Sequence, residues 1–169
     1  QLFLSISPER HLKRLVVAGY YRVFTICKNF RNEGIDQSHN PEFTMLEFYQ
    51  AYANYEVLMK MTEELIYKLL KKLNLKDTID YQGKKLNFKS IKRVTFRELL
   101  LKEIGVDIEK ADDFDKLKKE IEKKKLNQVD ISACKHYGSL LDELYKRVVR
   151  PNIIQPTFLT HYPVEMIAL

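Results

Sequence analysis

Hydrophobic and polar residues alternate along two neighbouring stretches of the chain, residues 21–30 and 42–51. A period of two places successive side chains on opposite faces of a strand, so each stretch is expected to form one. The residues between them, 32–41, are polar and include Gly34 and an Asn-Pro pair, which is typical of a loop. The pattern therefore predicts two antiparallel strands joined by a polar loop.

Elsewhere the apolar residues recur with helical spacing or in shorter alternating runs. Thr95 and Glu98 form the sequence signature of a capping box, and Gly105 is a stop signal for the helix that follows. The order of these elements predicts an α+β fold, an antiparallel sheet flanked by helices. Helices are expected over residues 9–18, 54–73, 95–105, 112–125 and 139–149, and further strands over residues 2–6, 78–81, 84–88 and 157–161.

The composition is that of a globular protein. A chain of 169 residues with 45% hydrophobic residues is long enough for one sizeable core. Cys27 and Cys134 form neither a metal-binding spacing nor a disulfide framework, which favours a reducing compartment and predicts a cytoplasmic location. No apolar run approaches the roughly 18–20 residues that span a bilayer, so no membrane partner is expected. The chain starts without Met in a strand-like stretch, so we expect it to begin within a fold.

The chain carries a net charge of +6 and has a pI of about 9.2. A basic balance favours polyanionic partners. Lysines supply most of the positive charge, without a cluster of arginines and interleaved aromatic residues, so solvated lysine-rich faces explain the balance as well. The net charge alone leaves both interpretations open.

Polar residues on and after the two predicted strands are candidates for binding a charged ligand. Arg31 follows the first strand, and its planar guanidinium can hold a phosphate through two hydrogen bonds. Its spacing alone, however, favours a surface ion pair with Glu33. Glu47 and Tyr49 lie two residues apart, so both side chains reach the same face of the second strand and can line one pocket.

Three further residues each have a plain structural explanation when considered alone. A phenylalanine on a strand, such as Phe43, is ordinarily a core residue, and a histidine in a loop, such as His39, is ordinarily solvated. The helix dipole alone favours Glu9 in the first turn of its helix. The ordered string of residues in which they occur gives the stronger indication of function.

That string comprises residues 30–34 (FRNEG), 39–44 (HNPEFT) and 47–49 (EFY). It resembles motif 2 of the class II aminoacyl-tRNA synthetases and, in its details, the lysyl-tRNA synthetases. The resemblance covers residues 2–75 and, less fully, residues 150–169. It implies that residues 1–169 form part of a class II catalytic domain. The motif 2 strands and loop would occupy residues 21–51, and a peripheral helical insertion would occupy residues at about 76–150.

The resemblance implies an ATP-binding site. Arg31 would be the catalytic residue and would bind the α-phosphate of ATP. Glu33 would accept a hydrogen bond from the adenine amino edge, His39 would reach the γ-phosphate, and Phe43 would stack on the adenine ring. No metal ligand is assigned to this chain, and Mg²⁺ is expected to be held by residues outside it.

The same resemblance implies a lysine-binding site. Arg31 would contact the carboxylate of the bound lysine, and Glu9 would hold its α-amino group. Glu47 and Tyr49 would line the pocket for the side chain, where a carboxylate favours an ammonium group. The aspartyl and asparaginyl synthetases are related, but Glu47 with Tyr49 suits a cationic side chain better than an anionic one.

The implied activity is that of a lysine–tRNA ligase, which forms lysyl-adenylate from lysine and ATP and transfers the lysyl group to tRNA(Lys). The full-length protein is expected to be a homodimer. This chain lacks motifs 1 and 3, so we expect it to be inactive by itself. Two alternatives stay open, a paralogue that lysylates elongation factor P and a non-catalytic synthetase-like binding module. Gly34 and residues 49–55 resemble the tRNA enzyme more than the paralogue.

Overall fold

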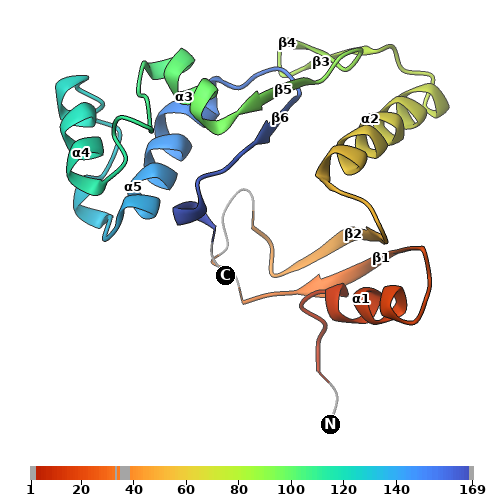
Figure 1. The fold of residues 1–169 in the computed structure, drawn as a ribbon. Helices are drawn as coiled ribbons and strands as arrows, with labels where there is room; N and C mark the ends of the chain where they lie inside the picture. The colour runs from red at the N-terminus through yellow and green to blue at the C-terminus, as the bar shows by residue number, and fades with distance from the viewer. Residues whose placement is uncertain (1–2, 33, 35–38, 168–169) are drawn as a thin grey trace. The chain divides into compact units, whose positions relative to one another are not determined.

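The computed structural model describes residues 3–32, 34 and 39–167 (Figure 1). The chain divides into two compact units, residues 1–58 and residues 59–169. Each unit has its own architecture. Among the described residues, no helix is both long and apolar enough to cross a membrane.

The first unit is a helix packed on a β-hairpin. Strands β1 and β2 pair antiparallel along their whole length, from Arg22 opposite Gln50 to Phe30 opposite Glu42. Helix α1 lies against both strands, as Figure 1 shows. The strand pair predicted from alternation is therefore confirmed. The elements are α1 (Glu9–Val17), β1 (Arg22–Phe30), β2 (Glu42–Gln50) and the beginning of α2 (Tyr55–Lys72).

The second unit contains two small sheets and a group of helices. Strands β3 and β4 form an antiparallel hairpin, whereas β5 and β6 pair in parallel. The strands are β3 (Thr78–Tyr81), β4 (Lys84–Asn87), β5 (Lys92–Thr95) and β6 (Thr157–Thr160). The helices are α3 (Phe96–Ile104), α4 (Phe114–Lys123) and α5 (Tyr137–Leu144), and α5 continues into a π-helical turn (Tyr145–Val149). Short 3₁₀ turns span Ile131–Ala133, Arg150–Asn152 and Val164–Met166.

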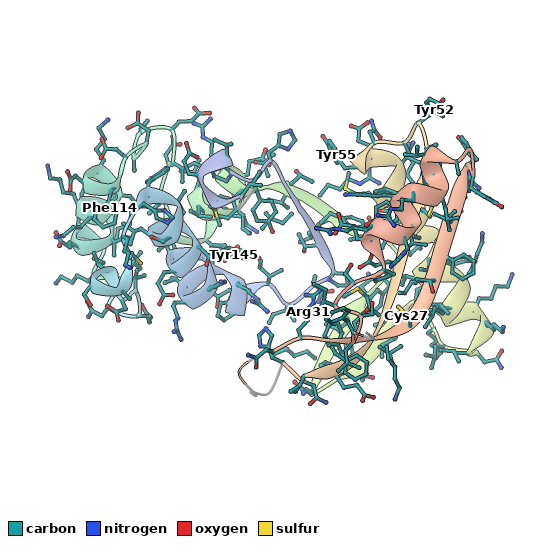
Figure 2. All side chains as sticks on the ribbon, turned by 90° about the horizontal axis from the view of Figure 1, so that it is seen from below. Cys27, Arg31, Tyr52, Tyr55, Phe114 and Tyr145 are labelled. Carbon is teal, nitrogen blue, oxygen red and sulfur yellow. The ribbon has the colours of Figure 1, made fainter. Side chains whose placement is uncertain are left out.

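The hydrophobic core lies in this second unit. Phe96 is fully buried, and its ring centroid lies 5.5 Å from those of both Tyr145 and Tyr162. Figure 2 labels Tyr145, together with Phe114 at the start of α4. The apolar faces of α3, α4 and α5 supply most of the cluster. Its buried members are Phe96, Leu99, Leu100, Val106, Ala111, Leu117, Ile121, Val129, Leu140, Leu141, Leu144 and Val149.

Local signals fix the ends of α3. The hydroxyl of Thr95 accepts a hydrogen bond from Glu98 N, and the Glu98 carboxylate accepts one from Thr95 N, so the predicted capping box is confirmed. Gly105 ends the helix in the left-handed conformation, with φ of 65°. These contacts satisfy backbone groups that a helix end would otherwise leave unpaired.

The predicted α+β fold is confirmed, and three details differ from the expectation. The described residues 3–6 form no strand. A backbone hydrogen bond joins them to β1, in which the carbonyl of Ser5 accepts from Phe30 N at 2.8 Å. Strand β5 was not expected, because its four residues are half charged and run directly into the α3 cap. The helix expected over 139–149 is α-helical only as far as Leu144, and a π-helical turn begins at Tyr145.

Candidate functional site

One face of the β1–β2 hairpin gathers the predicted ligand-binding residues. Phe43, Glu47 and Tyr49 occupy alternate positions of β2 and therefore share a face. In the antiparallel register, Asn29 lies opposite Phe43 and Thr25 lies opposite Glu47. All three predicted β2 side chains are partly buried, so they are held in place while part of each stays accessible.

Glu47 is positioned by two neighbouring hydroxyl groups. The Ser7 hydroxyl donates to one carboxylate oxygen at 2.9 Å, and the Tyr49 hydroxyl lies 3.5 Å from the other. Ser7 also accepts a hydrogen bond from Glu9 N at 3.1 Å, so a single serine links the start of α1 to the strand. The arrangement orients the Glu47 carboxylate across the face of the hairpin.

An ammonium group of the chain itself lies at this part of the face. Lys13 forms an ion pair with Glu9, and its Nζ lies 5.9 Å from the centroid of the Tyr49 ring. The hydrogen bond from Lys13 lowers the pKa of Glu9, and Glu9 in turn raises the pKa of Lys13. Burial, followed by the carboxylates of Glu9 and Glu47, raises the pKa of Tyr49, which keeps its phenol protonated. Two carboxylates and an aromatic ring thus create a place that favours a cation.

Arg31 directly follows β1, where Figure 2 labels it. Its Nε donates to the carbonyl of Ile6 at 3.1 Å, and its backbone N donates to the carbonyl of Pro41 at 3.0 Å. Its guanidinium carbon lies 5.3 Å from the centroid of the Phe43 ring. The structure therefore brings Arg31 and Phe43 together at one end of the hairpin, as a cation beside an aromatic ring.

A polar contact inside the hairpin stabilises the end of the hairpin where Arg31 lies. Asn29 is fully buried, and its side-chain carbonyl accepts a hydrogen bond from the Ser5 hydroxyl at 3.4 Å. Its amide nitrogen has no hydrogen-bond partner among the residues that the structure describes. With the backbone bond from Phe30 to Ser5, this contact fixes the segment that carries Ile6, the acceptor for Arg31.

The sequence interpretation did not assign the residues that hold the site. Ser5, Ser7 and Lys13 lie within residues 2–75, the span that the resemblance covers, but the resemblance assigned no role to them. One signal was available, since Asn29 is an amide at a strand position where alternation predicts an inward-facing side chain.

Two further residues, His39 and Glu33, belong to the predicted ATP site. His39 is exposed and precedes β2, which begins at Glu42. Glu33 lies outside the described residues, so its contact with adenine stays a prediction. Among the described residues, no group of three or more His, Cys, Asp or Glu side chains is arranged to hold a metal ion. The described part of this chain therefore does not fit a resident Mg²⁺ site, and the ion enters none of the steps proposed for it.

The site residues form two groups along β2. Arg31 and Phe43 mark one end, and Glu9, Glu47 and Tyr49 form the second group. Glu47 is the fourth residue after Phe43, a distance of about 13 Å along a strand. An elongated ligand with an anionic part and a cationic part matches this order of charges.

Comparison with known proteins gives a consistent result. A model of the family described as "tRNA synthetases class II (D, K and N)" matches residues 1–169. The lysine–tRNA ligase of Campylobacter jejuni is 44% identical over 165 residues, which cover 97% of this chain and 32% of that protein.

Two relatives from other organisms show similar agreement. The lysine–tRNA ligase of Chloroflexus aurantiacus is 42% identical, covering 98% of this chain and 33% of that protein. Lysine–tRNA ligase 2 of Methanosarcina mazei is 43% identical, covering 97% of this chain and 32% of that protein. The chain spans about a third of the length of the curated relatives it matches.

Proposed function

The chain belongs to the class II tRNA synthetases (D, K and N), and we propose from this premise that it forms the lysine- and ATP-binding part of a lysine–tRNA ligase. The observation that carries the proposal is the position of the Lys13 ammonium group. It lies against Glu9 and the Tyr49 ring, on the face that also bears Glu47. A substrate ammonium at Glu9 would take the place of the Lys13 ammonium, and Glu47 offers a second carboxylate on the same face.

The proposed reaction begins at the Arg31 end of the hairpin. A carboxylate oxygen of lysine attacks the α-phosphorus of ATP, the bond to the bridging oxygen breaks, and pyrophosphate leaves with lysyl-adenylate as the product. Arg31 would contact both the α-phosphate and the lysine carboxylate and so offset the negative charge that gathers there. Phe43 would stack on adenine, and His39 and Glu33 would contact the γ-phosphate and the adenine edge.

Selection of lysine would depend on the second group. Glu9 would hold the α-amino group, and Glu47 with Tyr49 would receive the side-chain ammonium. An aspartyl side chain would bring a like charge toward Glu47, which disfavours binding. Each ligand ammonium would meet a carboxylate that a neighbouring side chain already orients, which reduces the entropy lost on binding.

The acceptor is proposed to be tRNA, whose terminal ribose would receive the lysyl group. The names of the relatives favour tRNA over the protein acceptor that the sequence left open. ATP as substrate, a homodimer for the full-length protein and a cytoplasmic location, where protein synthesis takes place, belong to the same proposal.

Thermal unfolding with a non-hydrolysable lysyl-adenylate analogue tests the proposal. At about 100 times its dissociation constant, a ligand that binds the folded state adds roughly 2.7 kcal/mol, or a rise of about 5–10 °C in the unfolding temperature. The aspartyl analogue at the same concentration is expected to give a much smaller rise. Equal shifts with the two analogues, or no shift with either, would contradict the proposal.

A pair of variants tests whether ligand binding needs the planar guanidinium of Arg31 or only its positive charge. Arg31→Lys keeps the charge but loses the planar fork, so the rise with the lysyl analogue should shrink strongly. Arg22→Lys is the matched control, because Arg22 lies at the other end of β1 and is exposed. Its shift should equal that of the unchanged protein.

A further inference from the structure

The second unit contains a polar hollow remote in sequence from the motif 2 residues. It has a volume of about 420 Å³ and is open to solvent. Three of its lining residues come from the β3–β4 hairpin. The others are a residue of the bend before β5, the first residue of β5 and the residue before Pro156. The lining residues are Thr78, Lys85, Asn87, Ser90, Lys92 and Gln155.

The hollow is built by defined contacts. Gln155 Nε2 donates to the carbonyl of Lys85 at 2.9 Å, and its side-chain oxygen accepts from Asn87 N at 3.0 Å, which fixes Gln155 along the edge of β4. The side-chain oxygen of Asn87 accepts from Lys89 N at 2.9 Å. Its amide NH₂ group remains the part of the side chain that can donate to a ligand.

The register of the hairpin aligns the polar groups. Thr78 lies opposite Asn87, and Asp80 lies opposite Lys85, so these four side chains share one face. Asp80 is not among the lining residues. The lining therefore consists of ammonium, amide and hydroxyl groups, which can all donate hydrogen bonds, and it contains no carboxylate.

The charges around the hollow are unbalanced. Residues 81–97 contain no aspartate or glutamate, yet they include four lysines. Within the described part of the chain, no carboxylate lies within 4 Å of any of these four lysines, whereas the lysines of α4, for example, pair along their helix. The unpaired lysines are Lys84, Lys85, Lys89 and Lys92. An anionic partner would supply the negative charge that no described carboxylate brings within 4 Å of these lysines.

We propose that this basic hollow binds phosphate groups of an RNA backbone. Lysines spaced along β4, the following bend and β5 match a series of phosphates better than one enclosed phosphate. The inference rests on the proposed tRNA-ligase function, which makes RNA the polyanion this chain would meet. A second hollow in the same unit, of about 630 Å³, suits a polyanion less well, because four carboxylates line it beside Arg97: Glu98, Glu109, Asp112 and Glu165.

The test compares two double variants with the same change in charge. Lys85→Gln with Lys92→Gln removes two ammonium groups from the hollow. Lys118→Gln with Lys123→Gln removes two from α4, where both pair with glutamates. Binding of an unmodified lysine-acceptor tRNA transcript is measured by fluorescence anisotropy over a series of salt concentrations. Circular dichroism checks that both variants are folded.

The expected result is a smaller salt dependence for the first double variant. The slope of log affinity against log salt should fall by about one to two units, since each lost phosphate contact removes roughly 0.7–0.9. The α4 variant should keep the slope of the unchanged protein. Both variants should keep the thermal shift with the lysyl-adenylate analogue.

Three results would overturn the inference. The slope of log affinity against log salt could fall equally in both double variants, which would indicate a general charge effect. It could also stay unchanged in both. The variant of the hollow could also lose binding to phosphatidylserine-containing vesicles while its tRNA slope stays unchanged. A missing shift with the adenylate analogue would instead count against the proposed function of the motif 2 face, which this salt series does not measure.

Discussion

The residues proposed to bind lysine and ATP and the buried core lie in different units of this chain. Residues 1–58 carry every residue proposed to bind lysine or ATP, yet the buried residues described there are few: Pro8, Leu12 and Asn29. Residues 59–169 carry the buried core and none of those ligand contacts. A binding face must stay accessible, whereas a core must exclude water, so one short segment serves both purposes poorly.

The back of the hairpin makes the contrast sharper. Phe24 and Ile26 are 71% and 65% exposed, and Leu46 on the partner strand is 44% exposed. These residues occupy the face opposite Glu47 and Tyr49. With so little apolar area buried, the first unit is expected to open at a lower free energy than the second.

The largest expected effect is the loss of an aromatic side chain from the core of the second unit. Phe96→Ala should lower the free energy of unfolding by about 3–5 kcal/mol, because it removes a fully buried ring and leaves a cavity. Phe24→Ala is the matched change in the first unit and should cost about 0.5 kcal/mol or less. Urea denaturation followed by circular dichroism measures both, and similar losses would remove the distinction between the units.

A steric change at a glycine should have the next largest effect. A Cβ atom at Gly138 would lie 1.8 Å from the backbone oxygen of Glu165, so α5 could not keep its contact with the turn at Val164–Met166. Gly138→Ala should therefore cost about 1–3 kcal/mol. Gly34→Ala is the control, because a Cβ there meets nothing within 4 Å. Thermal unfolding without ligand compares the two, and an unchanged Gly138→Ala would refute the close packing.

Removal of a helix cap should have a smaller effect. Thr95→Ala deletes the hydroxyl that accepts from Glu98 N, at an expected cost of about 1 kcal/mol. Thr95→Ser keeps a hydroxyl at that position and should restore most of the loss. If serine and alanine destabilise equally in chemical denaturation, the methyl group rather than the cap would be responsible.

Acid should weaken the second unit through several small contributions. Hydrogen bonds from Arg97 lower the pKa of Asp107, and backbone and side-chain bonds from Thr95 lower that of Glu98. A carboxyl group with a lowered pKa in the folded state stabilises above its unfolded pKa. That stability is lost as the pH falls through the folded pKa, which for both groups lies below the ordinary value of the carboxyl group. The free energy of unfolding should thus be level near neutral pH and fall in acid, with a shallower fall for Asp107→Asn. An equally steep fall in that variant would exclude Asp107 as a cause.

The sequence predicted the strands and the shared face of the site better than the contacts that hold the site residues in place. Alternation around a polar loop placed β1 and β2 within a residue or two, and the shared face of Glu47 and Tyr49 followed from the period of two. The ion pair of Lys13 with Glu9 and the bond from Ser7 to Glu47 were not predicted. The first contact lies within α1, and the second joins the residue before Pro8 to β2. The alternation of apolar and polar residues along a strand gives no information on such contacts.

The second unit was predicted only in outline. The capping box and Gly105 located α3 from local chemistry. The parallel pairing of β5 with β6 joins residues about 65 positions apart, and a four-residue strand carries too few side chains to reveal its partner. The π-helical turn after Leu144 likewise depends on how the helix packs rather than on its composition.

Hydrogen exchange with and without the non-hydrolysable lysyl-adenylate analogue tests the division between the two units most directly. The account predicts slower exchange on binding at the start of α1, around Arg31 and along β2, with unchanged exchange in α3 and α5. Before ligand is added, the hairpin amides should exchange faster than those of α3 and α5. Protection by the ligand in α3 or α5 but not along β2 would contradict the account.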